Sequence, residues 1–128
     1  MSPHRLRSPR RALRALFATL PLAAAGLAQA QVGMSEWRVG ALPVTLVYPT
    51  QAGSRTQSFG AFTIDVARNA APLNQRQRLI VISHGTGGSA IADHALAATL
   101  ARAGFVVAQP LHAGDNHKDT RDAGPVAF

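Results

Sequence analysis

The residues best suited to chemistry lie in the glycine-rich segment Ser83-His84-Gly85-Thr86-Gly87-Gly88-Ser89. Glycine reaches backbone conformations that are closed to other residues, and it puts no side chain between the main chain and a ligand. The main-chain N–H groups of such a segment can therefore hold an oxyanion or a phosphate group. A tight turn between a strand and a helix, with no ligand at all, would need the same glycines.

A second polar segment follows, between Leu111 and Asp122. It contains side chains of types that bind metals, namely His112, Asp115, His117, Asp119 and Asp122. Metal sites normally need a helix or strand geometry that aims the ligands, and here the spacing is irregular. We therefore expect a solvated loop, with no metal and no other cofactor.

Two strands and a helix must position these segments. Leu79-Ile80-Val81-Ile82 is an unbroken apolar, largely β-branched run, as expected of a strand covered on both faces, and Phe105-Val106-Val107-Ala108 is a second one. Between them the pattern predicts a helix over 91–103, with an apolar stripe of Ala92, Leu96 and Leu100. Ser89 would cap its first turn, and Asp93, Arg102 and Gly104 suit its two ends.

This strand–helix–strand unit predicts two parallel strands joined by a right-handed crossover. Ligands of open α/β sheets bind at the carboxyl ends of such strands, where 83–89 and 111–122 would both lie. Earlier in the chain, 44–48 and 62–66 are strand candidates, with Phe62, Ile64 and Val66 on the core side, whereas 50–58 is expected to be a loop. The predicted fold class is α/β, a mostly parallel sheet with an antiparallel start, about four strands and one helix.

The N-terminal residues predict export. Five of the thirteen basic residues fall within the first fourteen positions, an apolar run of about thirteen residues follows, and Ala28-Gln29-Ala30 completes a cleavage site. We interpret 1–30 as a signal peptide for the general secretory route, although Arg10-Arg11 would also suit the twin-arginine route. The apolar run is too short for a stable membrane anchor, so a periplasmic or secreted domain over 31–128 is expected.

The charge of that domain excludes some functions. From Gln31 onward eight basic residues face six acidic ones, which is ordinary for a domain that binds no nucleic acid. The chain has no cysteine, so neither disulfides nor thiol chemistry are available to it.

Two enzymatic interpretations fit the glycine-rich segment. Gly85 to Ala90 satisfies the dinucleotide fingerprint G-x-G-x-x-A, but the second strand ends in Gln109 where an acidic, ribose-binding residue would be expected. The alternative is an oxyanion loop, in which the His-Gly-x-Gly-Gly segment donates a main-chain N–H to a tetrahedral intermediate.

A family resemblance favours the second interpretation. The stretch from Phe59 to Asn116 resembles the predicted dienelactone hydrolases, a branch of the α/β-hydrolases related to bacterial platelet-activating-factor acetylhydrolase-like lipases. The resemblance rests on four segments in order, at 59–63, 79–88, 101–108 and 110–116. It implies the first four strands of an eight-stranded, mostly parallel sheet and a small ester or lactone substrate. It also implies Thr86 as the oxyanion N–H donor, His84, Gly85, Gly87 and Gly88 as the rest of the oxyanion loop, and a pocket loop with His112, Asp115 and Asn116.

The chain departs from that family in its catalytic residues. No G-x-S-x-G nucleophile motif is present, and Gly87-Gly88-Ser89-Ala90-Ile91 lacks the second glycine. We expect Ser89 to cap the helix and His84 to have a structural role, so that no member of a catalytic triad is present. The sequence is therefore interpreted as the N-terminal, inactive portion of a serine-dependent ester hydrolase. A dinucleotide-binding oxidoreductase and a small, non-catalytic secreted binding domain remain the alternatives.

Overall fold

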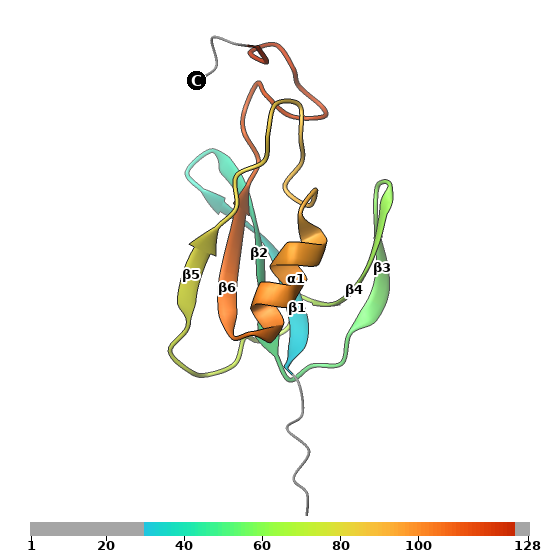
Figure 1. Ribbon diagram of the computed structural model, residues 1–128, viewed down its shortest axis with the longest axis vertical. Helices are drawn as coiled ribbons and strands as arrows, with labels where there is room; N and C mark the ends of the chain where they lie inside the picture. The colour runs from blue at the N-terminus through green and yellow to red at the C-terminus, as the bar shows by residue number, and fades with distance from the viewer. Residues whose placement is uncertain (1–29, 125–128) are drawn as a thin grey trace, which may run out of the picture.

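The computed structural model describes residues 30–124, which form one six-stranded sheet with a helix on one face (Figure 1). Residues 1–29 of the predicted signal peptide lie outside the described part. The elements are β1 (Gln31–Val39), β2 (Leu42–Thr50), β3 (Arg55–Phe59), β4 (Phe62–Arg68), β5 (Arg78–Val81), α1 (His94–Arg102) and β6 (Phe105–Pro110). Their order across the sheet is β3-β4-β1-β2-β6-β5.

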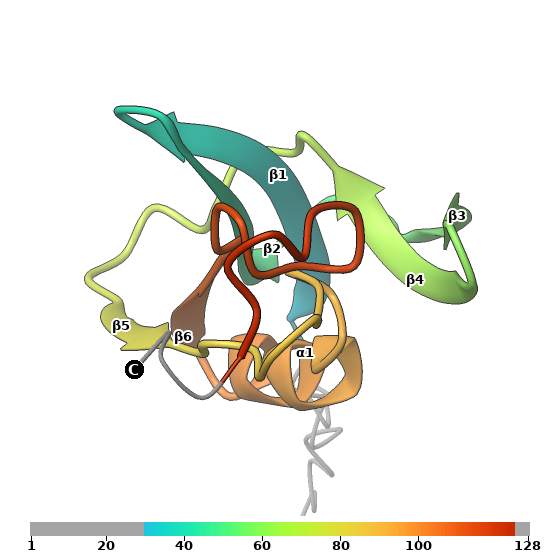
Figure 2. The ribbon, with the colours of Figure 1, turned by 90° about the horizontal axis from the view of Figure 1, so that it is seen from above.

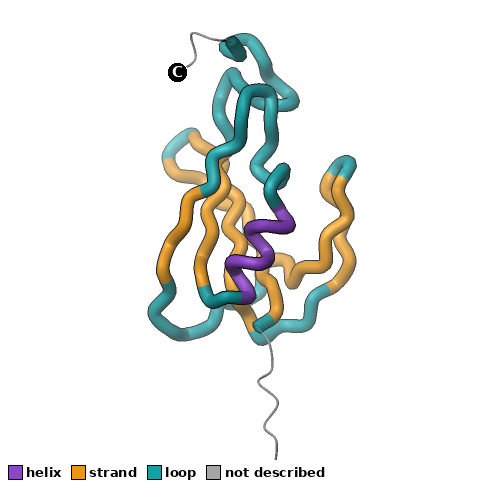
Figure 3. The backbone as a smooth tube through the Cα atoms, viewed as in Figure 1, coloured by secondary structure: helices purple, strands orange, loops and turns teal. Residues whose placement is uncertain are grey.

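The predicted fold class is wrong. Antiparallel pairing joins β1 to β2, β2 to β6 and β3 to β4, and only the pairs β1–β4 and β5–β6 are parallel. Strands dominate the described chain, which has a single nine-residue helix (Figure 3). The structure is thus a mixed, strand-rich sheet, and the expected α/β-hydrolase fold with its mostly parallel sheet is not observed.

The antiparallel character comes from two hairpins. Gly40-Ala41 joins β1 to β2, and Gly60-Ala61 joins β3 to β4. Each glycine has a φ of 61°, a backbone conformation that side chains disfavour and that two-residue hairpin loops need at this position.

The sequence pattern missed β1 and β3 for different reasons. In β1, Val32 and Met34 are buried on the helix side, whereas Trp37 and Val39 belong to the opposite face of the sheet. Apolar residues therefore occur at both even- and odd-numbered positions of this strand. In β3 the residues are mostly polar, because this strand is a sheet edge that pairs with β4 alone. Neither strand presents the alternation that identifies a half-buried strand.

Helix α1 is shorter than predicted and uses a different buried surface. It begins at His94, with Asp93 at the N-cap position and no side-chain capping bond, so the prediction that Ser89 caps it is wrong. Its buried residues are Ala97, Ala98 and Ala101, while Leu96 is 52% exposed. Alanine lets the helix approach the sheet closely. Of the predicted stripe, Ala92 and Leu96 are exposed and Leu100 packs against the core partly buried. The C-terminal prediction is confirmed, since Gly104 adopts a φ of 96° and its N–H donates to Ala101 O.

The core lies between α1 and one face of the sheet (Figure 2). Its buried members come from five elements, and they are Val32, Met34, Val47, Ile64, Val66, Ala97, Ala98, Ala101 and Val107. The predicted core side of β4 is confirmed, because Ile64 and Val66 are buried and Phe62 packs against them partly exposed. Among the described residues, no helix is long and apolar enough to cross a membrane.

Candidate functional site

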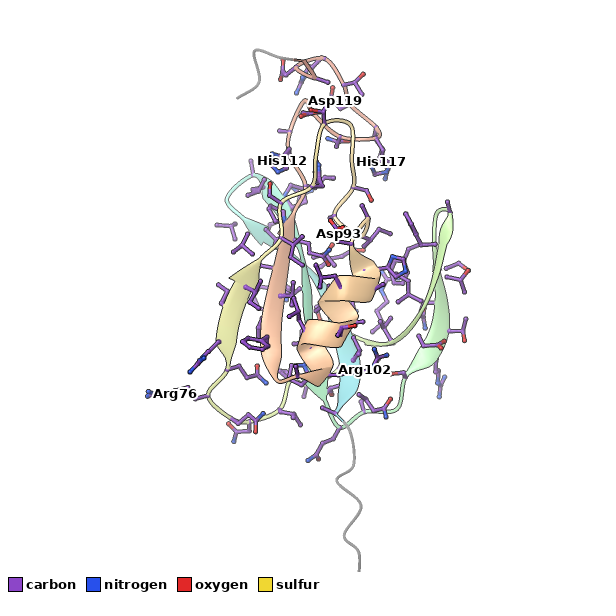
Figure 4. All side chains as sticks on the ribbon, in the orientation of Figure 1. Arg76, Asp93, Arg102, His112, His117 and Asp119 are labelled. Carbon is purple, nitrogen blue, oxygen red and sulfur yellow. The ribbon has the colours of Figure 1, made fainter. Side chains whose placement is uncertain are left out.

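The glycine-rich segment and the 111–124 loop lie together at one end of the sheet. They follow β5 and β6, which are parallel neighbours with Val81 opposite Ala108. Both loops therefore leave the sheet at the same end, where the carboxyl ends of these strands lie (Figures 1 and 4). Two hydrogen bonds join them: Gly87 N–H donates to Asp115 Oδ1 at 2.7 Å, and His117 N–H donates to Gly88 O at 2.9 Å. The prediction that both loops follow the carboxyl ends of two parallel strands is confirmed.

The glycine-rich segment forms a tight turn over 85–88. Gly88 N–H donates to Gly85 O at 3.0 Å, and Gly87 has a φ of 68°. A Cβ atom placed on Gly88 would lie 2.8 Å from Gly85 O and 3.0 Å from His84 Cβ. The backbone therefore needs glycine at 87 for its conformation and at 88 for its close approach.

Thr86, the predicted oxyanion donor, lies at the exposed corner of this turn. Within the described residues no acceptor takes its main-chain N–H, whereas the N–H groups of Gly87 and Gly88 are both engaged. The turn thus leaves the predicted N–H group available to an incoming oxygen atom.

His84 connects the two loops through both ring nitrogens. Its Nε2 accepts the main-chain N–H of His112 at 3.1 Å, which leaves Nδ1 as the protonated nitrogen that donates to Gly85 O at 2.8 Å. With both nitrogens engaged, His84 holds the turn against the 111–124 loop and has no free nitrogen with which to act as a base.

Asn116 organises the second loop. It is buried, its amide Nδ2 donates to His112 O at 2.6 Å, and its Oδ1 accepts the N–H groups of Lys118 and Asp119. The loop that presents Asp115 to the turn is therefore fixed by its own side chains. Of the predicted pocket-loop residues, Asp115 contacts the turn directly, His112 contacts it through His84, and Asn116 supports both.

One pairing was not anticipated from the sequence. Ser83 Oγ lies 2.8 Å from His112 Nε2, and the His112 ring stacks edge-on against His84 with centroids 4.4 Å apart. Within the described residues no carboxylate is hydrogen-bonded to the other nitrogen of His112. The sequence offered one signal for this contact, the position of the two residues: each lies two residues beyond the end of one of two adjacent parallel strands.

A cavity of about 600 Å³ borders the turn at Gly87 and Gly88. Much of its wall is apolar and comes from the β3–β4 hairpin, the segment before α1 and the start of the 111–124 loop, including Phe59, Phe62, Ile91 and Leu111. Glu36, His117 and Lys118 supply its charged or polar margin. Sequence reasoning missed this cavity because the β3–β4 hairpin reaches it only through the folding of the sheet.

The remaining acidic residues of the second loop form ion pairs. Arg121 lies 3.3 Å from Asp119 Oδ2 and 3.7 Å from Asp122 Oδ2. Over residues 30–124 no three His, Cys, Asp or Glu side chains gather in a way that could hold a metal ion.

Neither a scan against protein-family models nor a search of curated proteins found a match to this chain.

Proposed function

We propose that this chain serves in carboxylic-ester hydrolysis by supplying the oxyanion-binding turn. The observation that carries the proposal is the main-chain N–H of Thr86, which no group within residues 30–124 accepts, in a turn whose neighbouring N–H groups are hydrogen-bonded. An N–H group that is already oriented stabilises the negative oxygen of a tetrahedral intermediate without reorganisation during the reaction. One such donor contributes about 10²–10³ in rate in known hydrolases.

The surroundings of the turn support an ester or lactone as substrate. Gly87 and Gly88 form part of the wall of the 600 Å³ cavity, so an acyl or alkyl group can lie against apolar side chains while its carbonyl group is near the turn. Burial of such a group contributes about 0.8 kcal/mol per methylene. A small, largely apolar ester fits this combination better than a charged substrate.

The proposal assigns Asp115 to positioning. Its carboxylate accepts Gly87 N–H at 2.7 Å and so orients the peptide next to Thr86. The negative charge of the Asp115 carboxylate repels the negative oxygen of the intermediate. The orienting hydrogen bond and the charge of Asp115 therefore have opposite effects on the binding of an anion at the turn. A substitution can separate these two effects.

The test is a titration of the ¹⁵N-labelled full chain with butylphosphonate, a tetrahedral anion that resembles the intermediate. We expect the Thr86 amide resonance to shift most, and Asp115→Ala to weaken binding about tenfold despite the loss of a negative charge. Asp115→Asn keeps an oxygen acceptor for Gly87 N–H and should restore binding.

Asp119→Ala is the matched control, because it removes the same charge from the same loop without touching the turn. Binding that is unchanged or tighter in Asp115→Ala would contradict the proposal. So would resonance shifts that leave Thr86 unmoved.

A second candidate function is favoured by the Ser83–His112 contact, in which a serine hydroxyl lies within hydrogen-bonding distance of a possible base. The main proposal assigns no nucleophile to this chain and expects no serine-dependent hydrolysis of p-nitrophenyl esters. Labelling by a fluorophosphonate that Ser83→Ala abolishes and Ser89→Ala retains would establish the second candidate instead.

A further inference from the structure

The β3–β4 hairpin supplies a wall of the cavity that comes from outside the glycine-rich turn. Strand β4 pairs with β1 at its carboxyl end, through Ala67 and Arg68, so the rest of the hairpin extends beyond that pairing (Figure 1). Its tip reaches the segment around the start of α1, where the ring of Phe62 contacts that of His94. The cavity is lined by the whole tip, namely Phe59, Gly60, Ala61 and Phe62.

Two phenyl rings form the apolar part of this tip. Phe59 and Phe62 are directly opposite each other in the register of β3 and β4, so their side chains lie on the same face of the hairpin. Each ring is held by a neighbouring side chain. The ring centroid of Phe62 lies 5.1 Å from that of His94, and the guanidinium group of Arg68 lies 5.6 Å from the centroid of Phe59. Both rings are half-buried and in defined positions.

The same arginine pairs with the acidic group of the cavity. Among the described residues, Glu36 is the one carboxylate in the cavity wall, and its Oε1 lies 3.5 Å from Arg68 Nη2. Arg68 thus joins Glu36 to Phe59 on the outer side of the hairpin. The wall therefore presents phenyl rings together with a carboxylate that already has a cationic partner, and this combination suits a hydrocarbon group better than a charged one.

We propose that the β3–β4 hairpin binds the far end of the substrate's hydrocarbon chain, and that Phe62 and Phe59 determine the preferred chain length. This inference rests on the proposed function, because the turn over 85–88 must hold the carbonyl end of the same substrate. The substrate class becomes an ester with an unbranched hydrocarbon chain longer than a butyl group.

The positions of the lining residues along the chain support this division of the cavity. Ile91 follows Gly88 by three residues, and Leu111 begins the loop that is hydrogen-bonded to the turn. These two side chains are suited to contact the carbons nearest the carbonyl group, whereas the phenyl rings come from a separate element and are left for more distant carbons. A cavity of about 600 Å³ lies in the size range that holds whole drug-sized ligands, so a four-carbon chain leaves much of it unfilled.

The test compares butylphosphonate with hexylphosphonate in titrations of the ¹⁵N-labelled full chain. A buried methylene strengthens binding about fourfold, so we expect the wild type to bind the hexyl compound at least about tenfold more tightly. Phe62→Ala should reduce this preference to about twofold or less and leave the affinity for butylphosphonate nearly unchanged. Phe62→Leu keeps an apolar side chain and should retain most of the preference. Thr63→Ala is the matched control, because Thr63 is exposed on the same strand and lies outside the cavity wall.

A measurement on the wild type keeps the proposal falsifiable if Phe62→Ala disturbs folding. Nuclear Overhauser effects should connect the terminal methyl group of hexylphosphonate with the ring protons of Phe62. Equal affinities of the wild type for the two phosphonates, a hexyl preference that Phe62→Ala leaves at full size, or the absence of methyl-to-ring effects would each overturn the proposal. If the Thr86 amide shifts with both phosphonates in such a case, this inference alone is wrong. If neither phosphonate shifts the Thr86 amide, the proposed function fails, and this inference fails with it.

Discussion

At the scale of single residues, the turn over 85–88 requires glycine at 87 for its backbone conformation and at 88 for its close contact with Gly85 and His84. Gly88 lies where a Cβ atom would contact the carbonyl oxygen of Gly85. The carboxylate of Asp115, in the 111–124 loop, accepts the main-chain N–H of Gly87. His84 contributes through its tautomer, because Nε2 accepts from one loop while Nδ1 donates to the other. These residues position the turn, and the N–H of Thr86 is the group left available.

Gly88 provides a prediction at this scale. Gly88→Ala places a Cβ 2.8 Å from Gly85 O, a contact that requires the turn to shift, so we expect a loss of about 1–3 kcal/mol in the free energy of unfolding. Urea denaturation followed by circular dichroism measures it. Gly85→Ala is the matched control: a Cβ there meets nothing within 4 Å, and its effect should stay within about 0.5 kcal/mol. Equal stability of the two variants would contradict the described geometry.

At the scale of elements, α1 and the two hairpins decide what the sheet can present. The helix covers one face through alanines, which allow a close approach and leave Leu96 in solvent. The β3–β4 hairpin extends beyond the sheet and supplies Phe59 and Phe62 to the cavity. The cavity therefore depends on an element far from the glycine-rich turn in the sequence.

The helix provides a second prediction. Ala101 is fully buried against the sheet, so Ala101→Leu should overpack the core and lower the free energy of unfolding by about 1–3 kcal/mol. Leu96→Ala, on the exposed side of the same helix, should change it by no more than about 0.5 kcal/mol. Thermal or urea unfolding of the two variants checks both values. A larger effect at Leu96 than at Ala101 would show that the helix packs through the leucine stripe instead.

At the scale of the whole molecule, the polar loops gather at one end of the sheet, beyond the carboxyl ends of β5 and β6 (Figure 1). The described domain starts directly after the predicted signal peptide, since β1 begins at Gln31. Cleavage after Ala30 would therefore leave every strand intact.

Processing provides the third prediction. We expect the exported protein to begin at Gln31, because the basic, apolar and Ala-x-Ala segments occur in the order that a signal peptidase requires. Intact-mass spectrometry of the exported product measures this directly. Ala30→Arg should block cleavage and leave the full-length chain, while the same substitution at Ala41, in a hairpin loop, should leave processing unchanged. A mature chain that still starts at Met1 would refute the prediction.

The sequence by itself determined the local features of this protein. The strands at β5 and β6, the helix between them and its glycine-terminated end follow from apolar runs and capping residues, which act over a few neighbouring positions. Segments 83–89 and 111–122 each follow one of two predicted parallel strands, and this position correctly predicted that the two segments lie together. The glycines of the turn were recognisable for the same reason, since a required backbone conformation restricts residue type directly.

Only the tertiary structure decided the rest. The antiparallel majority of the sheet depends on which strands pair, and β3 carries no apolar pattern because an edge strand buries little. Ser83 and His112, like Gly87 and Asp115, meet across 29 and 28 residues of chain, so no local rule specifies these contacts. The cavity requires the β3–β4 hairpin to pack beside loops from the other half of the domain. Such long-range contacts form because the whole sheet buries its apolar face against α1. No single segment of the sequence determines that cooperative packing.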